Sequence, residues 1–594
     1  MSVPNENGDE HTRGAEACRL KRAMTAVRTR LRELSKPEVL KPAAVCGFML
    51  FLLWCECAAF YFSRIEVRSI LRPFVKGAGL YLAIFGLSLL PGGRTTKILL
   101  TIWLILMGAV AAVGVFLHLR FALDMNSDCF FVLAVSSPAE VKEFLDRFLN
   151  WKLAAALGAA AVVCGGVIAL VWRTGFRRSR LNTTVSLLLV LPFVLQCALL
   201  IFVVKDPPAV FSQSNLPRVV FGYFVYRDKL SELLKLEKNP QLPSGIRALP
   251  GSETLVGVLV IGESANCNHW GAYGYPRDTT PQIDKRLDHC VVYDDTVAAA
   301  AWTGGAIYRM FTDATIRRRR AKFTFIDVLK AAGWRVVLIS NHNRWGRKDG
   351  PIGILTAHCD RRIYMQDLVR YPFDGDMLPV LEDELRKASG GRLLIIVHLM
   401  GSHHNFSARY PKGFSRFDGV RDRCNSGMSG EHAKELNEYD NTIAYTDSVL
   451  GGILERLEKR TEPAFMIYCS DHSETGGWSG YRHARSAATA IPDLYEIPFV
   501  FWANDQYRRA FPQLVEGAAR NRHSPMQADT LIWSIISAAQ VTFDGFPREK
   551  DIFSGADYRP PKERRMKYRT PYHPSAAKRK LQETRRIESE TKKP

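Results

Sequence analysis

Residues Leu255-Val-Gly-Val-Leu-Val-Ile-Gly-Glu263-Ser264 combine an uncharged apolar run with an acidic and a hydroxyl side chain at its end. A run of this length and composition predicts a buried strand. Four similar runs follow, with helical patterns such as 376–389 and 431–459 between them. This alternation is typical of an α/β domain with a mostly parallel sheet sandwiched by helices. The further predicted strands are 335–340, 393–397, 465–469 and 498–502.

Polar side chains gather where three of these strands end. Glu263 follows the first strand, His398 and His403 follow the third, and Asp471 and His472 follow the fourth. Because ligand sites in such sheets lie just past the carboxyl ends of strands, we expect these groups at one rim. Carboxylate and imidazole groups suit a zinc-like ion that acts as a Lewis acid toward a phosphoryl group. One Asp-His pair would be weak evidence, but several groups after different strands predict a metal site.

Thr303 is the candidate nucleophile. It stands between a run of small residues and an apolar helical pattern, in Ala301-Trp302-Thr303-Gly304-Gly305. A hydroxyl at a helix N-terminus would meet a phosphate where backbone N–H groups also face it. Taken alone, a threonine before two glycines is more often a cap or turn residue. The catalytic interpretation therefore depends on metal ligands beside it.

The first 205 residues are dominated by apolar runs. Crossing a bilayer takes roughly 20 mostly apolar residues. Glu56 lies within the first run, where an ionisable group is either functional or, more often, paired within the helix bundle. The sequence predicts an α-helical membrane domain with five spans, at 43–63, 74–90, 98–117, 153–172 and 185–204.

Arginine and lysine cluster before the first span and after the fourth. Since cytoplasmic loops keep positive charge, we expect a cytoplasmic N-terminus and, after five crossings, an exported C-terminal half. The net charge of +21 would suit nucleic acid or anionic lipid, and the apolar N-terminal half favours lipid over nucleic acid. The predicted parts are a basic segment 1–42, a membrane domain 43–204, a connector 205–250, a catalytic domain 251–545 and a basic tail 546–594 whose composition predicts disorder.

These motifs, in this order, resemble those of the phosphoethanolamine transferases of Gram-negative inner membranes. That family belongs to the alkaline phosphatase and sulfatase superfamily and modifies lipid A or core sugars of lipopolysaccharide. The resemblance extends over roughly 43–545. The matching stretches are Val258-Leu-Val-Ile-Gly-Glu263, Tyr273-Gly-Tyr-Pro-Arg-Asp-Thr-Thr-Pro281, Ala301-Trp-Thr303, His398-Leu-Met-Gly-Ser-His403, Tyr439-Asp-Asn-Thr-Ile-Ala-Tyr-Thr-Asp447 and Ser470-Asp-His-Ser-Glu-Thr-Gly476.

The resemblance implies a role for each matching residue. Thr303 would carry the phosphoethanolamine group in a ping-pong reaction from phosphatidylethanolamine to lipopolysaccharide. It also implies a monomeric, multi-pass inner-membrane protein whose catalytic domain lies in the periplasm. The implied zinc ligands are Glu263, Thr303, Asp471 and His472, and the implied substrate-binding residues are His403, His483 and Asn341.

Departures from the lipid A subgroup bear on the acceptor. Trp302 precedes the nucleophile, His404 follows His403, and Ser473 follows the Asp-His pair. These features are closer to the subgroup that acts on core heptose, which we therefore favour over lipid A. A glycerol-phosphate transferase or a phosphodiesterase of the same superfamily is the alternative. A sulfatase would place a cysteine or serine at position 303, and a non-catalytic scaffold would have lost the ligand residues.

Five cysteines lie in the predicted catalytic domain, so at least one thiol would stay unpaired in an exported protein. Their spacing does not indicate which of them pair. They are Cys267, Cys290, Cys359, Cys424 and Cys469.

Overall fold

The chain divides into two compact units, one of residues 1–119 with 142–221 and one of 120–141 with 222–594. Each is described by itself. The structure is a computed structural model, and it describes residues 24–26, 36–61, 67–121, 150–176, 180–198, 215–342, 350–387, 390–479, 491–567, 570–579 and 583.

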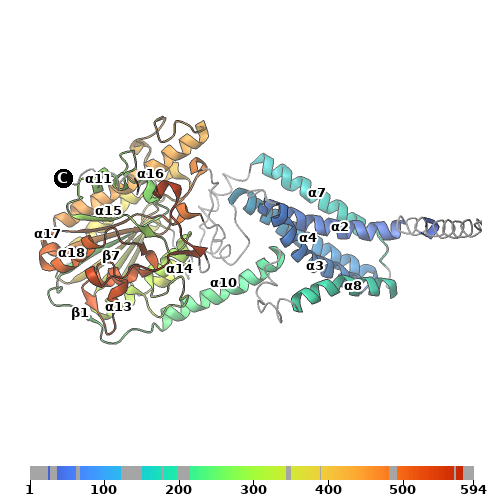
Figure 1. The fold of residues 1–594 in the computed structure, drawn as a ribbon, viewed down its shortest axis with the longest axis horizontal. Coiled ribbons are helices and arrows are strands. Elements are labelled where there is room, and N and C mark those ends of the chain that lie inside the picture. Colours follow the sequence, from blue (N-terminus) through green and yellow to red (C-terminus); the bar gives the residue numbers. More distant parts are fainter. Residues whose placement is uncertain are drawn as a thin grey trace, which may run out of the picture. The chain divides into compact units, whose positions relative to one another are not determined.

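The first unit is a bundle of helices (Figure 1). Three of them contain segments long and apolar enough to cross a membrane: Val39–Ala58, Gly93–Leu117 and Trp151–Arg173. The other two predicted spans are helical, but their apolar parts are shorter, Gly77–Leu89 and Asn182–Ala198. Five helices therefore stand where five spans are predicted, and three meet the requirement for length and composition. They are α2 (Pro37–Tyr61), α3 (Val67–Leu89), α4 (Gly93–Phe121), α7 (Trp151–Arg173) and α8 (Arg180–Ala198).

Helices α3 and α8 approach closely at a glycine. A Cβ atom on Gly86 would lie 2.9 Å from the carbonyl oxygen of Ser186, closer than real Cβ contacts allow. Small residues at such crossings let two backbones come together in an apolar environment. The shorter apolar helices are thereby held against each other.

Glu56 of α2 is paired inside this unit. Its carboxylate accepts hydrogen bonds from the hydroxyl of Tyr81, at 3.1 Å, and from the backbone N–H of Asn215, at 3.2 Å. Asn215 is the first residue of α10 (Asn215–Lys238). The carboxylate therefore satisfies one of the backbone donors that a helix N-terminus leaves open. Of the two interpretations of Glu56, the structure supports pairing within the bundle.

Helix α10 occupies much of 205–250, which was predicted only as a connector and not as one long helix. Pro217 lies in its first turn, where a missing backbone N–H costs nothing. Leu233 and Leu236, near its end, are buried in the core of the second unit.

The second unit is built on a seven-stranded sheet in the order β3-β9-β8-β2-β7-β5-β6. The pairs β8-β2, β2-β7, β7-β5 and β5-β6 are parallel, and only β9 runs against the others in this sheet. The prediction of a mostly parallel sheet is confirmed. Its strands are β2 (Leu255–Gly262), β3 (Cys290–Tyr293), β5 (Arg335–Ser340), β6 (Arg361–Tyr364), β7 (Arg392–His398), β8 (Ala464–Ser470) and β9 (Phe499–Ala503).

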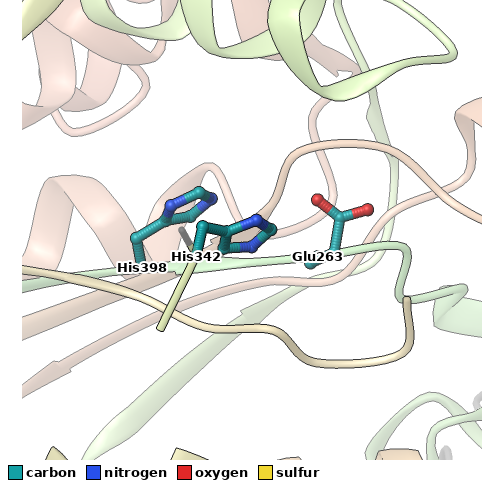
Figure 2. Close-up of side chains that lie close together, drawn as sticks. All are labelled: Glu263, His342 and His398. Atoms are coloured by element: carbon teal, nitrogen blue, oxygen red, sulfur yellow. The ribbon is translucent and has the colours of Figure 1, made fainter. Parts of the chain in front are cut away.

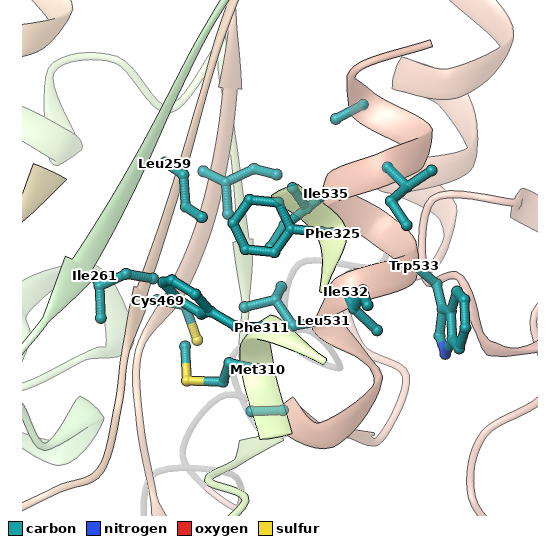
Figure 3. Packing of buried hydrophobic residues seen from close by; sticks show 14 of the residues in the cluster. Leu259, Ile261, Met310, Phe311, Phe325, Cys469, Leu531, Ile532, Trp533 and Ile535 are labelled. Atoms are coloured by element: carbon teal, nitrogen blue, oxygen red, sulfur yellow. The ribbon is translucent and has the colours of Figure 1, made fainter. Parts of the chain in front are cut away.

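Helices cover both faces of the sheet (Figure 1). On one face, Leu259 and Ile261 of β2 pack with Phe311, Phe325 and Ile535 (Figure 3). On the other, the alternate β2 residues pack against α11, α15 and α16. Alternation of this kind buries both sides of a central strand, which explains why β2 is apolar throughout. The helices are α11 (Pro281–Asp284), α12 (Thr303–Phe311), α13 (Phe325–Ala331), α14 (Gly350–Leu355), α15 (Met377–Arg386), α16 (Gly430–Glu458), α17 (Asp505–Ala510), α18 (Pro512–Arg520) and α19 (Leu531–Ala538).

Three two-stranded sheets complete the unit. Each joins segments that the sequence did not predict as strands. The pairs are β1 (Arg247–Ala248) with β11 (Val541–Thr542), β4 (Thr296–Val297) with β10 (Met526–Gln527), and β12 (Arg565–Lys567) with β13 (Thr570–Pro571).

The basic tail is folded over its described part, so the prediction of disorder for 546–594 is wrong there. The hydroxyl of Tyr572 and the backbone N–H of Ser575 both donate to the buried carboxylate of Glu496, at 2.8 and 2.7 Å. The ammonium of Lys578 lies 3.2 Å from a carboxylate oxygen of Asp295. The prediction of disorder rested on the high proportion of charged residues in the tail. In the structure, several of these charged and polar groups contact partners within the fold.

Candidate active site

Glu263 follows β2 directly and lies at the middle of the sheet. Its side chain is buried. The next residue, Ser264, has a left-handed backbone with φ of 59°, which is uncommon for a residue other than glycine and is typical of functional sites. This turn aims the backbone N–H of Ser264 at Oδ1 of Asp471, 3.1 Å away. This hydrogen bond therefore joins the segment that carries Glu263 to Asp471, so that two of the predicted ligands lie close together.

Asp471 and His472 follow β8, the neighbour of β2, and both are buried. Oδ1 of Asp471 accepts hydrogen bonds from the N–H groups of Ser264 and His472, the latter at 2.6 Å. Nδ1 of His472 lies 2.8 Å from the carbonyl oxygen of Ser473, so Nδ1 carries the proton and Nε2 keeps a lone pair. Nε2 is 3.4 Å from Oδ2 of Asp471 and 3.5 Å from Oε1 of Glu263. Oδ2 of Asp471, Oε1 of Glu263 and Nε2 of His472 thus lie close together.

Thr303 is the first residue of α12, and its side chain faces this point. The hydroxyl oxygen is 3.1 Å from Oε2 of Glu263 and 3.4 Å from Nε2 of His472. A Cβ on Gly304 would lie 2.3 Å from the Trp302 ring, so a larger residue at this position would require the ring to move. Because the N-cap position belongs to Trp302 and the Thr303 hydroxyl bonds Glu263, the interpretation of Thr303 as a cap is wrong.

The arrangement fits a divalent cation. Ligand atoms of Glu263, Asp471 and His472 all lie within 4.8 Å of one another. Two buried carboxylates side by side are unfavourable without a cation, and burial together with the charge of Glu263 raises the pKa of Asp471. Carboxylate and imidazole are ligand types that zinc takes in proteins, and with the Thr303 hydroxyl the group would offer the usual number of four.

A second group, Glu263 with His342 and His398, also lies within 4.8 Å (Figure 2). The two imidazole rings are stacked, with centroids 3.9 Å apart and planes 9° apart. An imidazole binds a metal in its ring plane, so parallel stacked rings do not direct both lone pairs at one ion. Burial and the neighbouring His342 lower the pKa of His398 well below its usual value, which keeps this ring neutral. Of the two groups, the one with Asp471 and His472 therefore suits a metal ion better.

Sequence reasoning did not select His342. The residue comes two positions after the end of β5, and Ser340 of β5 pairs with His398 of β7. The signal that selected Asp471 and His472, a polar side chain just past a strand, applies equally to it.

The other predicted substrate residues are placed differently. The His403 ring lies edge-on to His342, with centroids 6.4 Å apart, and so belongs to the same rim. The side-chain nitrogen of Asn341 donates to Asp374, at 2.7 Å, and the structure does not bring this amide into the Glu263 cluster. His483 lies outside the described residues.

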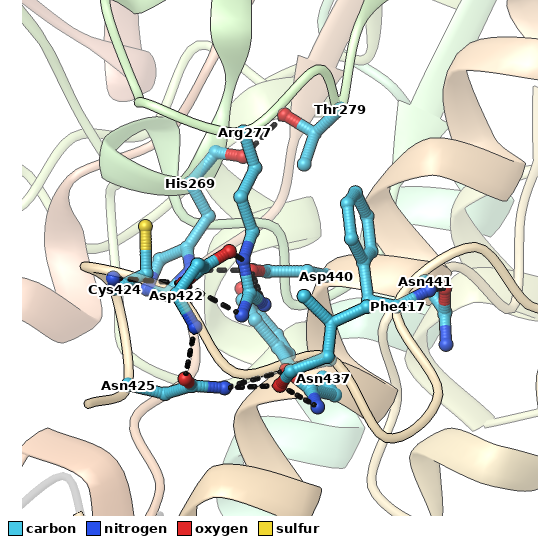
Figure 4. Close-up of polar contacts among 12 residues, drawn as sticks. His269, Arg277, Thr279, Phe417, Asp422, Cys424, Asn425, Asn437, Asp440 and Asn441 are labelled. Carbon is cyan, nitrogen blue, oxygen red and sulfur yellow. Dashed lines mark hydrogen bonds and ion pairs between the residues drawn. The ribbon is translucent and has the colours of Figure 1, made fainter.

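A network of polar contacts joins the segment after β2 to α16 (Figure 4). The carboxylate of Asp440, on α16, is bonded by Arg277 at 2.7 Å, by Tyr275 at 2.8 Å and by His269 at 2.8 Å. Arg277 also makes a two-bond contact with Asp422, at 2.9 and 3.1 Å. The motifs 273–281 and 439–447 therefore fix a long loop and α16 to the segment after β2.

Comparison with known proteins agrees with this architecture. A family model described as Sulfatase matches residues 256–541. Phosphoethanolamine transferase EptC of Escherichia coli K12 is 23% identical over 486 residues, which is 77% of this chain and 83% of that one. Phosphoethanolamine transferase EptA of Helicobacter pylori is 33% identical over 260 residues, 42% of this chain and 48% of that one.

Solved structures show the same fold. The integral membrane protein lipooligosaccharide phosphoethanolamine transferase A of Neisseria meningitidis matches with a TM-score of 0.65 and 20% identity, covering 87% of this chain and 99% of that one. The periplasmic domain of Escherichia coli EptC in complex with zinc matches with a TM-score of 0.50 and 23% identity, covering 54% and 92%. Residues 256–541 therefore form a sulfatase-family domain, and the chain as a whole is similar to phosphoethanolamine transferases.

Proposed function

We propose that this protein transfers phosphoethanolamine from phosphatidylethanolamine to lipopolysaccharide through a covalent intermediate on Thr303. The observation that carries the proposal is the convergence of the Thr303 hydroxyl on Glu263 and His472, at 3.1 and 3.4 Å. The names of the relatives as phosphoethanolamine transferases support the transferred group. We further propose a monomer in the inner membrane, with a cytoplasmic N-terminus and a periplasmic catalytic domain.

Glu263, Thr303, Asp471 and His472 would hold the metal, and we propose zinc. The zinc complex of the Escherichia coli EptC domain supports this choice. Bound there, the ion would withdraw charge from a phosphoryl oxygen and make the Thr303 hydroxyl more acidic.

The first half-reaction uses the position of Thr303. Its hydroxyl donates to Glu263, so this carboxylate is placed to take the proton as the oxygen attacks phosphorus. The new bond joins Thr303 Oγ1 to phosphorus, and the bond from phosphorus to the diacylglycerol oxygen breaks, with a proton from water completing diacylglycerol. Thr303 begins α12, so backbone N–H groups in the first turn of that helix would be available to the charge that develops on the phosphoryl oxygens.

The second half-reaction reverses these roles. An acceptor hydroxyl attacks phosphorus, its proton is released, and Thr303 Oγ1 leaves and regains a proton. We assign contact with the phosphate groups to His403 and His483. Asn341 acts indirectly, because its amide holds Asp374, which accepts from the backbone N–H groups of Met400 and Gly401 beside the site.

The acceptor proposed here is core heptose in preference to lipid A, and it rests on the residues around Thr303 and His403. Mass spectrometry of lipid A and of core oligosaccharide, separated from cells with the intact protein or with Thr303→Ala, tests both reaction and acceptor. We expect a phosphoethanolamine increment on the core fraction that disappears in the variant. An increment on lipid A alone would show that lipid A is the acceptor in place of core heptose. Identical profiles of the two proteins in every fraction would overturn the proposed function.

A further inference from the structure

A short apolar loop stands exposed at the rim that carries the candidate site. Leu368, Val369 and Tyr371 are 60%, 40% and 73% exposed. Among the described residues of 251–579, Leu287 is the only other large apolar side chain counted as exposed. Exposed apolar residues scattered singly need no explanation, but three within four positions mark an interaction surface. We call residues 368–371 the rim loop.

The rim loop has an ordered base. The N–H groups of Leu368 and Val369 both donate to the carbonyl oxygen of Met365, at 2.9 and 2.8 Å. At the other end, the side-chain nitrogen of Asn341 donates to the carbonyl oxygen of Pro372, at 3.4 Å. The backbone is therefore held at both ends while the apolar side chains face solvent.

The position of the loop relates it to the chemistry. It follows β6, whose last residue, Tyr364, pairs with Ser340 of β5, and Ser340 pairs with His398 of β7. The carboxyl ends of β5, β6 and β7 therefore lie at the same rim of the sheet. The segment that follows β6 begins at this rim, which also carries Glu263. Asp374, just beyond the loop, accepts from the N–H of Gly401, and the next N–H, of Ser402, donates to the carbonyl oxygen of Glu263 at 2.9 Å.

The composition of the loop fits a membrane surface. Leu368 and Val369 are aliphatic, and the guanidinium of Arg370 lies over the Tyr371 ring, 5.5 Å from its centroid. Tyrosine is enriched at the boundary between water and hydrocarbon, and arginine there meets anionic headgroups while its stem stays in apolar surroundings. On the proposed function, the candidate site must take its donor from a bilayer. A bilayer therefore accounts for the placement of the rim loop beside this site, whereas a soluble protein partner would not.

We propose that the rim loop inserts into the surface of the phospholipid bilayer and positions the candidate site at the level of the lipid headgroups. Only the reason for the membrane contact, access to a lipid donor, rests on the proposed function. The contact itself is a property of the surface, and it can be measured without turnover.

Photo-crosslinking of the full chain in vesicles of phosphatidylethanolamine and phosphatidylglycerol measures the contact. The probe is Tyr371→benzoylphenylalanine, and the matched control is Leu287→benzoylphenylalanine. Leu287 precedes β3, which runs in the same direction as β8, so it lies at the opposite edge of the sheet. We expect lipid adducts, detected by mass spectrometry, at position 371 and not at 287. Equal lipid adducts at both positions, or adducts at 371 with a second copy or another protein in place of lipid, would overturn the proposal.

A kinetic comparison separates docking from damage to the site. Leu368→Ser/Val369→Ser should raise the KM for phosphatidylethanolamine in vesicles by roughly tenfold, because two apolar anchors are lost. Turnover of a short-chain phosphatidylethanolamine dissolved as monomers should stay within about twofold, as it should for Leu287→Ser with both substrates. Equal slowing of both substrates by the double variant would contradict docking. If the intact protein turns over neither substrate, the proposed function fails, while the crosslinking result still decides the membrane contact.

Discussion

The hydroxyl oxygen of Thr303 lies 3.1 Å from Oε2 of Glu263, although the two residues are 40 positions apart in the chain. One begins a helix and the other follows the central strand, so the contact depends on α12 and β2 packing in the same core. The proposed nucleophile is thus aligned with a proton acceptor before any substrate arrives.

Replacing the nucleophile should abolish transfer without unfolding the protein. Thr303→Ala is expected to lower the transfer rate by more than about a thousandfold, since a covalent route needs this oxygen. Thr303→Ser keeps the hydroxyl and should retain a measurable rate. Transfer of labelled phosphoethanolamine, with melting temperatures measured in parallel, checks both. An alanine variant with more than a tenth of the normal rate would exclude Thr303 as nucleophile.

Metal content should depend on Asp471. Asp471→Asn removes one ligand charge and is expected to lower bound zinc by at least about tenfold, with activity falling in proportion. Asp418→Asn, an exposed residue outside the cluster, is the control and should bind metal normally. Elemental analysis of purified protein before and after a chelator gives the measurement. Unchanged metal content in Asp471→Asn would place the ion elsewhere.

Asp447 should make stability depend on pH. Burial raises the pKa of its carboxyl to about 7, although the N–H groups of Gln282 and Ile283 donate to it. Because the folded state holds this proton more tightly than the unfolded state, the free energy of unfolding should fall as pH rises from about 4 to about 7.

The neutral variant isolates this effect. In Asp447→Asn the fall should be smaller by roughly 3 kcal/mol, since the side chain cannot lose a proton. Denaturant unfolding of the detergent-solubilised protein at several pH values measures it, with the exposed Asp557→Asn as control. The same slope in all three proteins would show that Asp447 is ionised throughout.

Two adjacent basic residues of the tail should differ in their effect on stability. The Lys578 side chain is 3% exposed and pairs with Asp295, whereas Arg579 is exposed. Burial raises the pKa of Asp295, but Lys578 and Arg564 outweigh it and bring the pKa below its usual value. Lys578→Met should therefore cost roughly 3 kcal/mol, and Arg579→Met should cost about nothing. Thermal unfolding of the two variants decides whether the tail belongs to the fold.

The central strands and the rim were predictable because each carries a strong local signal. The predicted strand 335–340 coincides with β5, and the ends of β2 and β8 put Glu263, Asp471 and His472 where the strand-end rule places them. Central strands are apolar on both faces, so their limits are visible in composition alone.

Edge strands and long-range pairs were not predictable in this way. β6, Arg361–Tyr364, begins with two arginines, and β3, Cys290–Tyr293, is only four residues long. The direction of β9 depends on how the chain connects β8 to β9, which local sequence patterns do not predict. Lys578 carries the same charge as its neighbours, and only the three-dimensional position of Asp295 distinguishes it.

Mass spectrometry of the purified protein after incubation with phosphatidylethanolamine, without acceptor, tests the central claim most directly. We predict that the peptide containing Thr303 gains one phosphoethanolamine group, that diacylglycerol appears in equal amount, and that added acceptor removes the group. Release of diacylglycerol with every Thr303 peptide unmodified, or a group attached to a different residue, would contradict the proposed mechanism.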